Sequence, residues 1–99
     1  MKINIQGVGV SPRQELQDLI NEKLNKLDRL TDRITEAKVT LRIEKAETHD
    51  NKIMEVRLGL PGNDIFVKKH GDSFEELVQK TSDVLTRELK DWKEKVQGK

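Results

Sequence analysis

The sequence predicts a two-layer α/β (α+β) sandwich, in which a four-stranded sheet has two helices packed on one face. The spacing of apolar residues alternates between strand and helical periods, in the order β-α-β-β-β-α. Each predicted strand has one apolar and one polar face, which is typical of an antiparallel sheet covered on one side. With 99 residues, the chain is expected to form a single domain, residues 1–99.

The first half of the chain predicts a strand, a helix and a second strand. Apolar and polar residues alternate over residues 2–6, and glycines follow. Ser11 and Pro12 are typical of a helix N-cap and a first helical position. Helical spacing then links Leu16, Leu19, Ile20, Leu24, Leu27 and Leu30. Strand alternation returns over residues 38–44.

The middle of the chain predicts two further strands, one at residues 55–60 and a shorter one that starts at Ile65 and is broken at His70-Gly71-Asp72, separated by the turn-forming run Pro-Gly-Asn-Asp. Short links should join these strands to the preceding one as a meander. The polar segment 47–52 is expected to be a loop.

The last segment, residues 73–99, predicts one long amphipathic helix. Ser73 and Glu76 form an S-x-x-E capping box at its start. The apolar face comprises Phe74, Leu77, Val78, Thr81, Leu85, Leu89, Trp92 and Val96. The cations outside it are Lys80, Arg87 and Lys90 on the opposite face, with Lys93 and Lys95 flanking the apolar stripe.

Composition excludes several classes of protein. The 19 basic and 18 acidic residues nearly cancel, to a net charge of +1, so bulk charge identifies no partner. The absence of cysteine excludes disulfides and thiolate metal sites. The start lacks the apolar run of a signal peptide, and no segment reaches membrane-spanning length. We therefore expect a soluble cytoplasmic domain without a membrane partner.

The sequence contains no catalytic constellation. The two histidines, His49 and His70, are predicted in a polar loop and at a strand end, without metal-ligand spacing between them. Gly7-Val8-Gly9 lacks the third glycine of a dinucleotide-binding fingerprint. We expect no enzyme activity, no cofactor, no metal and no small-molecule substrate.

Nucleic-acid binding has two forms to consider. Base stacking on a sheet requires exposed aromatic residues, and the sheet offers only Phe66, which argues against that mode. The alternative is recognition of phosphates by lysine and arginine. The open sheet face, either merely solvated or a binding face, should expose Lys2, Asn4, Lys38, Thr40, Arg42, Glu44, Arg57 and Lys68.

One lysine of the first helix stands out by its position. Lys23 projects at about 340° when Leu16 is set to zero, inside the apolar arc. It can extend its ammonium past its apolar neighbours into water. Alternatively, the two helices meet here, and Lys23 emerges in their groove beside Lys26.

Several segments, taken in order and with their spacing, resemble the short ribosome hibernation-promoting factor family, which includes the ribosome-associated translation inhibitor. These segments are Asn4-Ile5, Gly7, Val10, Leu16, Lys23, Lys26-Leu27, Asp32-Arg33-Ile34, residues 39–45 and residues 83–89, followed by Lys93 and Lys95. The resemblance runs nearly end to end, and the element order agrees with the family fold.

The resemblance implies a non-enzymatic protein that binds the small ribosomal subunit and its 16S rRNA in the mRNA and tRNA channel, silencing ribosomes in stationary phase or stress. The cations that match the family's contacts are Lys23, Lys26, Arg87, Lys93 and Lys95. Helical geometry adds Lys80 and Lys90 to these candidate rRNA-binding residues. Val84, Glu88 and Asp91 depart from the family pattern and make the last helix less basic, so weaker or more salt-sensitive binding is expected.

The chain stops soon after the last helix, as in the family's short forms, which by analogy need a separate ribosome-dimerising factor. A monomer is expected off the ribosome. Two alternatives remain open: a double-stranded RNA-binding module not specific to ribosomes, and a protein-interaction module that modulates a sigma factor.

Overall fold

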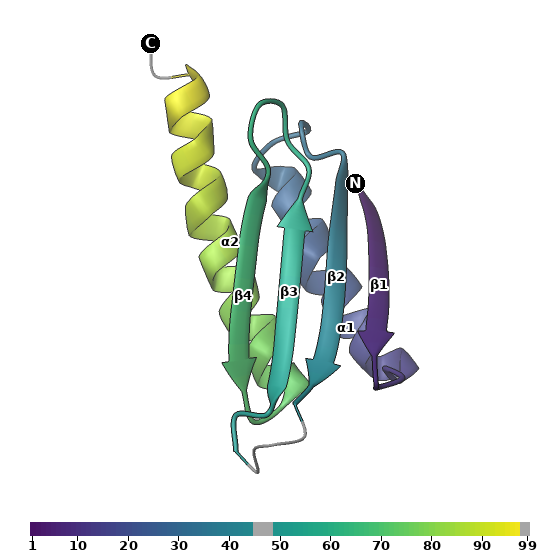
Figure 1. Ribbon diagram of the computed structural model, residues 1–99. Coiled ribbons are helices and arrows are strands. Elements are labelled where there is room, and N and C mark those ends of the chain that lie inside the picture. The colour runs from purple at the N-terminus through teal and green to yellow at the C-terminus, as the bar shows by residue number, and fades with distance from the viewer. Residues whose placement is uncertain (45–48, 98–99) are drawn as a thin grey trace.

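A computed structural model describes residues 1–44 and 49–97, in which four strands form one sheet and two α-helices lie against one of its faces (Figure 1). The elements are β1 (Lys2–Val8), α1 (Gln14–Asn25), the 3₁₀ helix η1 (Lys26–Arg29), β2 (Glu36–Ile43), β3 (Lys52–Leu58), β4 (Ile65–Gly71) and α2 (Phe74–Gln97). The predicted order β-α-β-β-β-α is therefore confirmed.

The sheet is mixed, so the expectation of an antiparallel sheet is wrong for its first strand. The strand order is β1-β2-β3-β4, and β1 runs parallel to β2, with Ile5 opposite Val39. β2, β3 and β4 form the predicted antiparallel meander. The parallel pair arises because α1 lies between β1 and β2, and this crossover returns the chain to the end of the sheet where β1 began.

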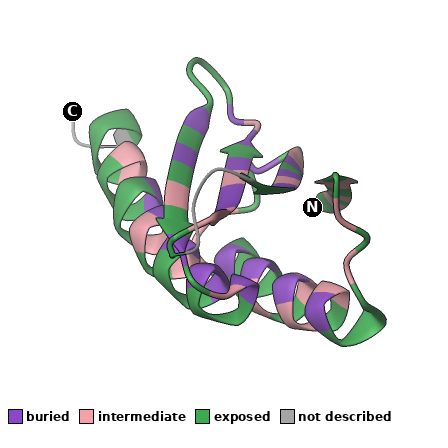
Figure 2. Cartoon of the chain, turned by 60° about the horizontal axis from the view of Figure 1, so that its bottom comes forward, coloured by how far each residue is buried: buried purple, intermediate pink, exposed green. Residues whose placement is uncertain are grey.

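The core lies between the sheet and the helices. Val39 on β2 is opposite Val56 on β3, which is opposite Val67 on β4, and all three are buried. Figure 2 shows buried positions alternating with exposed ones along the strands and lining the helices. The helices contribute Leu16, Ile20, Leu24, Phe74, Leu77, Val78, Leu85 and Leu89 to the core. The two-layer sandwich with helices on one face is confirmed.

The start of α2 agrees with the predicted helix cap. The backbone N–H of Glu76 donates a hydrogen bond to Ser73 Oγ at 3.2 Å, which satisfies one of the helix's free donors. The Glu76 carboxylate pairs with Lys80 Nζ at 3.1 Å, one turn further along the helix. The side chain of Ser73 therefore caps the helix, but the Glu76 carboxylate pairs with Lys80, so only the Ser73 half of the predicted capping box is seen among the described residues.

The start of α1 differs from its prediction. The helix begins at Gln14, and its N-cap Arg13 makes no side-chain cap bond, so Ser11 is not the N-cap. Pro12 belongs to the turn that precedes the helix. This turn lies so close to β1 that a Cβ added at Gly7 would be 2.9 Å from Pro12 Cδ and 2.0 Å from the carbonyl oxygen of Val10. Glycine is needed here because of that close approach.

The last two strands are longer than predicted or shifted along the chain. β3 begins at Lys52, earlier than predicted. The adjacent residues Ile53 and Met54 are both buried although they face opposite sides of the sheet, so the alternation of apolar and polar residues is interrupted there. Leu60 is buried beyond the end of β3, and β4 continues to Gly71. Part of the predicted loop 47–52 lies outside the described residues, as do the last two residues of the predicted final helix.

The apolar stripe of α2 leaves the core before the helix ends. Leu89 is fully buried and Trp92 is half-buried, but Val96 is 49% exposed, which corrects its assignment to the buried face. A helix of 24 residues is about 36 Å long, whereas a strand of seven residues spans about 24 Å. The last turns of α2 therefore extend beyond the sheet.

Candidate nucleic-acid interface

A groove of about 340 Å³ lies on the surface where α1 and η1 meet α2. Four cationic side chains line it: Lys23 from α1, Lys26 and Arg29 from η1, and Lys90 from α2. We call this hollow the helix groove. Its remaining lining residues are Leu27, Leu30, Gln79, Ser82 and Thr86.

Residue spacing explains why these side chains meet. Lys23, Lys26 and Arg29 follow one another at intervals of three, which places them on neighbouring parts of a helical surface in α1 and η1. On α2, the positions 79, 82, 86 and 90 recur every three or four residues and so form one row. Packing of α1 against α2 brings the two rows to opposite sides of the groove.

The helix groove concentrates positive charge in a chain whose net charge is only +1. Within residues 1–44 and 49–97, no carboxylate lines the groove, and none of its four cations takes part in an ion pair. Two nearby carboxylates have other partners, although Asp83 keeps its charge because its partner is the neutral amide of the groove residue Gln79. Asp28 pairs with the N-terminal amine at 3.0 Å, and Asp83 accepts a hydrogen bond from Gln79 Nε2 at 3.0 Å.

Lys23 lies at the groove between the two helices, as the second interpretation of its position predicted. The side chain is half-buried and borders the helix groove beside Lys26. A lysine in such a place buries its aliphatic stem while its ammonium group stays accessible. Whether Lys23 and Lys26 contact RNA remains a prediction.

The other predicted residues divide into separate groups. Lys90 lines the groove, and Lys93 continues its row by three residues. Lys80 and Arg87 are exposed, seven residues apart, and do not line the groove in the described part of the chain. Lys95 lies about 200° around the helix from Lys93, so these two cannot face the same side. The seven candidates therefore do not form one continuous surface.

Sequence reasoning missed two arginines. Arg29 lines the helix groove, and its spacing of three from Lys26 was the signal that could have identified it. Arg33 lies beside Lys93, Trp92 and Asp32 around a smaller hollow of about 250 Å³ near the end of α2. Arg33 belongs to a matched family segment, but its place in the connection before β2 gave no reason to expect it beside α2.

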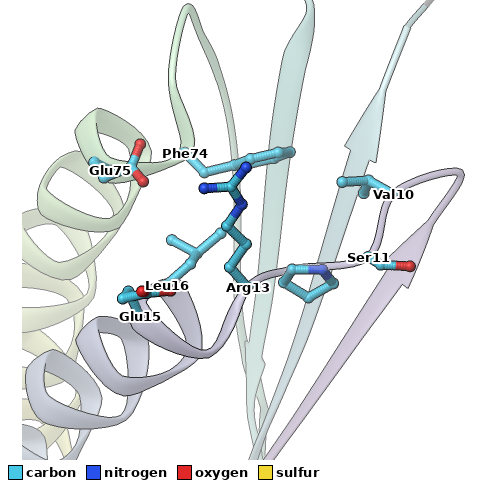
Figure 3. A pocket seen from close by; sticks show the side chains of 8 residues that line it. Val10, Ser11, Arg13, Glu15, Leu16, Phe74 and Glu75 are labelled. Carbon is cyan, nitrogen blue, oxygen red and sulfur yellow. The ribbon is translucent and has the colours of Figure 1, made fainter.

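A larger hollow, of about 460 Å³, lies between the β1–α1 connection and the start of α2 (Figure 3). Phe74 and Leu16 form part of its wall, and its charged side chains are Arg13, Glu15 and Glu75. Because its carboxylates outnumber its cations, this hollow is poorly suited to a polyanion. The smaller helix groove is the better candidate for RNA.

The described residues contain no group of three or more side chains with the chemistry to hold a metal ion. His49 and His70 are both exposed. In the part of the chain that the structure describes, neither helix has the length and apolarity needed to cross a membrane.

The fold and the helix groove define an α/β domain with a cationic cleft between its helices, an arrangement suited to a polyanion. The chain belongs to the family of sigma 54 modulation proteins and S30EA ribosomal proteins, whose model matches residues 3–97. This confirms the resemblance seen in the sequence. The family consists of non-enzymatic ribosome hibernation factors, so the prediction that the protein is not an enzyme is also confirmed.

Relatives of known name agree with this assignment. A ribosome hibernation promotion factor of Deinococcus radiodurans is 34% identical over 90 residues, covering 90% of this chain and 47% of that protein. The chain thus spans about half the length of that relative. A ribosome hibernation promoting factor of Pseudomonas putida is 31% identical, with 99% of this chain and 92% of that protein covered. For that of Escherichia coli K12, the identity is 29% and the coverage 97% of both.

Solved structures share the fold. The N-terminal domain of Thermus thermophilus Protein Y matches with a TM-score of 0.79 at 24% identity, covering 93% of this chain and 99% of that chain. A ribosomal subunit interface protein from Coxiella burnetii matches with a TM-score of 0.75 at 26% identity, covering both chains fully. These matches confirm the predicted fold class.

Proposed function

We propose that this protein is a ribosome hibernation factor that binds the 16S rRNA of the small ribosomal subunit, in the channel for mRNA and tRNA, and so inhibits translation in stationary phase or stress. The observation that carries the proposal is the helix groove, where four cations gather without a lining carboxylate among the described residues. Family membership indicates the ribosome as the target.

The groove's chemistry suits a phosphate backbone rather than base edges. Lysine offers phosphates a flexible point charge, and the guanidinium of Arg29 can hold two phosphate oxygens at once. Two of the three polar neighbours already donate hydrogen bonds, since Thr86 Oγ1 donates to the carbonyl of Ser82 at 2.8 Å and Gln79 donates to Asp83. Binding would therefore follow the shape and charge of folded rRNA.

Inhibition in this proposal is steric and needs no chemical step. A monomer seated in the channel occupies the space of both mRNA and tRNA. Arg87 and Lys93 would extend the contact beyond the groove, as the family resemblance implies. The protein would act in the cytoplasm, and pairing of idle ribosomes would require a separate dimerising factor.

Co-sedimentation with isolated small subunits at low and high salt tests this function. The protein is expected in the subunit fraction at low salt and to leave it as salt rises. Prebound protein should also reduce the retention of labelled mRNA and tRNA on the subunit. Absence from the subunit fraction at every salt concentration, or undiminished mRNA and tRNA binding with the protein bound, would contradict the proposal.

A double-stranded RNA-binding module is the second candidate, because α1-β2-β3-β4-α2 has the element order of such domains. In that case a plain RNA duplex would compete with ribosomes on equal terms. A role in sigma-factor modulation, which the family description includes, would instead give recovery of polymerase subunits without rRNA.

A further inference from the structure

The sheet face that points away from the helices carries an exposed aromatic residue. Phe66 on β4 is 51% exposed, whereas Phe74 is buried and Trp92 is half-buried. Directly opposite Phe66 in the register stands Arg57 on β3, and opposite Arg57 stands Lys38 on β2. These three residues form a row across the open face.

Arg57 and Phe66 are in contact. The guanidinium carbon of Arg57 lies 5.3 Å from the centroid of the Phe66 ring, within the range of a cation–π interaction. The nearest Arg57–Asp64 ion-pair contact is long, at 3.9 Å, and both side chains are substantially exposed. Such an exposed ion pair is weak and does not hold the Arg57 guanidinium away from other partners. The guanidinium and the Phe66 ring therefore both offer planar surfaces on which another ring can stack.

The open sheet face carries more cations than carboxylates, although the Asp64 carboxylate also lies beside Arg57. The open face of the described sheet carries Lys2, Lys38, Arg42, Arg57 and Lys68, against Glu36 and Glu55 on the strands. Arg42 pairs with Glu55 at 3.7 Å, but Lys38 and Lys68 form no ion pair with other described residues. Lys68 is two residues from Phe66, about 7 Å along the strand, and Lys38 is two strands away, about 10 Å.

We infer that this sheet surface binds single-stranded RNA, with one base stacked on the Phe66–Arg57 pair and Lys38 and Lys68 against the flanking phosphates. Base stacking on an aromatic ring beside cations is the usual basis of sequence-tolerant binding to single strands. The surface lies on the side opposite the helix groove, so it adds a second RNA contact to the proposed function. The sequence argued against stacking along the sheet because Phe66 stands alone; Arg57 supplies a second plane.

The chemistry favours RNA over a protein partner. A protein interface needs a contiguous apolar centre. Here the cross-strand neighbour of Phe66 is Arg57, and along its own strand the next residue on this face is Lys68. Phe66 therefore has the cations Arg57 and Lys68 beside it, with the Asp64 carboxylate two residues before it, and such polar surroundings match a base and its phosphates better than an apolar side chain.

The test uses fluorescently labelled hexauridylate, with fluorescence anisotropy measured at low salt. The starting protein is a groove variant, in which Lys23, Lys26, Arg29 and Lys90 are all glutamine, so that the helix groove does not contribute. We expect hexauridylate binding to remain and Phe66→Leu to weaken it about tenfold, because leucine keeps an apolar side chain but removes the stacking plane. Arg57→Lys, which keeps the charge, should weaken it also.

Amide chemical shifts recorded during the titration should change on the open faces of β2, β3 and β4. Binding unaffected by both substitutions, or shift changes confined to the helices, would overturn the inference. Equal affinity for hexaglutamate would overturn it too, since that result would indicate a general anion or peptide surface. The two proposals are tested separately by the groove variant. Its loss of ribosome binding tests the proposed function of the helix groove, whereas its retained hexauridylate binding tests the sheet surface.

Discussion

Lys90 and Lys80 have the same chemistry on the same helix but different surroundings. Lys90 lines the helix groove with three other cations, and no described carboxylate pairs with it. Lys80 lies outside the groove, and its ammonium pairs with Glu76 at 3.1 Å. Lys90 is therefore the better placed of the two for a phosphate, because it lies among other cations whereas Lys80 lies beside a carboxylate.

Replacing Lys90 by glutamine should weaken binding to small subunits by about tenfold, because one charge-assisted phosphate contact is lost. Lys80→Gln is the matched control and should change the affinity little, since that lysine lies outside the helix groove and beside Glu76. Filter binding at a single low salt concentration measures both. Equal losses in the two variants would show that only the overall charge of α2 matters.

Thr81 is the buried polar residue of α2. Its hydroxyl is fully buried and has no hydrogen-bond partner among the described residues. Thr81→Val should raise the free energy of unfolding by about 1 kcal/mol, because it removes a buried polar group without changing the shape. Thr86→Val is the control, since it loses the bond to Ser82 and should not stabilise. Urea unfolding of both variants checks this, and a Thr81→Val protein less stable than wild type would contradict it.

At the level of secondary structure, the helix groove depends on both helices together. α1 and η1 supply three cations and α2 supplies the fourth, so neither helix forms the groove alone. Packing of both helices on one face of the sheet fixes the spacing between the rows. The stability of each helix start therefore also supports the groove.

Ser73→Ala should lower the free energy of unfolding by about 1 kcal/mol, because Ser73 Oγ accepts a hydrogen bond from the N–H of Glu76 in the first turn of α2. Ser11→Ala should have an effect within about 0.5 kcal/mol, since Ser11 is exposed and does not cap α1. Chemical denaturation of the two variants gives the comparison. A loss of stability in Ser11→Ala as large as that in Ser73→Ala would contradict this and would support Ser11 as the N-cap of α1.

The element order and the core were predictable because periodicity reports directly which residues face inward. The direction of β1 was also predictable, because a helix between two neighbouring strands makes them parallel; the half-buried pattern of the strand alone, from which an antiparallel sheet was expected, does not distinguish the two. Adjacent apolar residues hid the start of β3 at Ile53 and Met54. The groove position of Lys23 was predictable from its place in the apolar arc. Arg33 was not, because its approach to α2 depends on tertiary packing.

At the scale of the whole molecule, a net charge of +1 conceals an uneven distribution. Several acids are tied up in local pairs, such as Asp28 with the N-terminus and Glu76 with Lys80, while the groove retains its cations. Affinity for a polyanion should therefore follow the local field rather than the net charge.

Salt dependence measures that local field. Four groove cations that neutralise phosphates should contribute about −3 to the slope of log K against log salt concentration. The groove variant should lose that contribution, and Lys90→Gln alone should reduce the slope by about 1. Titration of small subunits over a range of potassium chloride concentrations gives these slopes. An unchanged slope in the groove variant would place the phosphate contacts elsewhere.

The central claim is that the helix groove binds the rRNA of the small subunit. The most direct measurement is the dissociation constant for isolated small subunits, compared between the wild-type chain and the groove variant at one low salt concentration. We expect the groove variant to lose affinity by at least about 100-fold, with the stability of the fold unchanged. A correctly folded groove variant that binds small subunits as tightly as the wild type would contradict it.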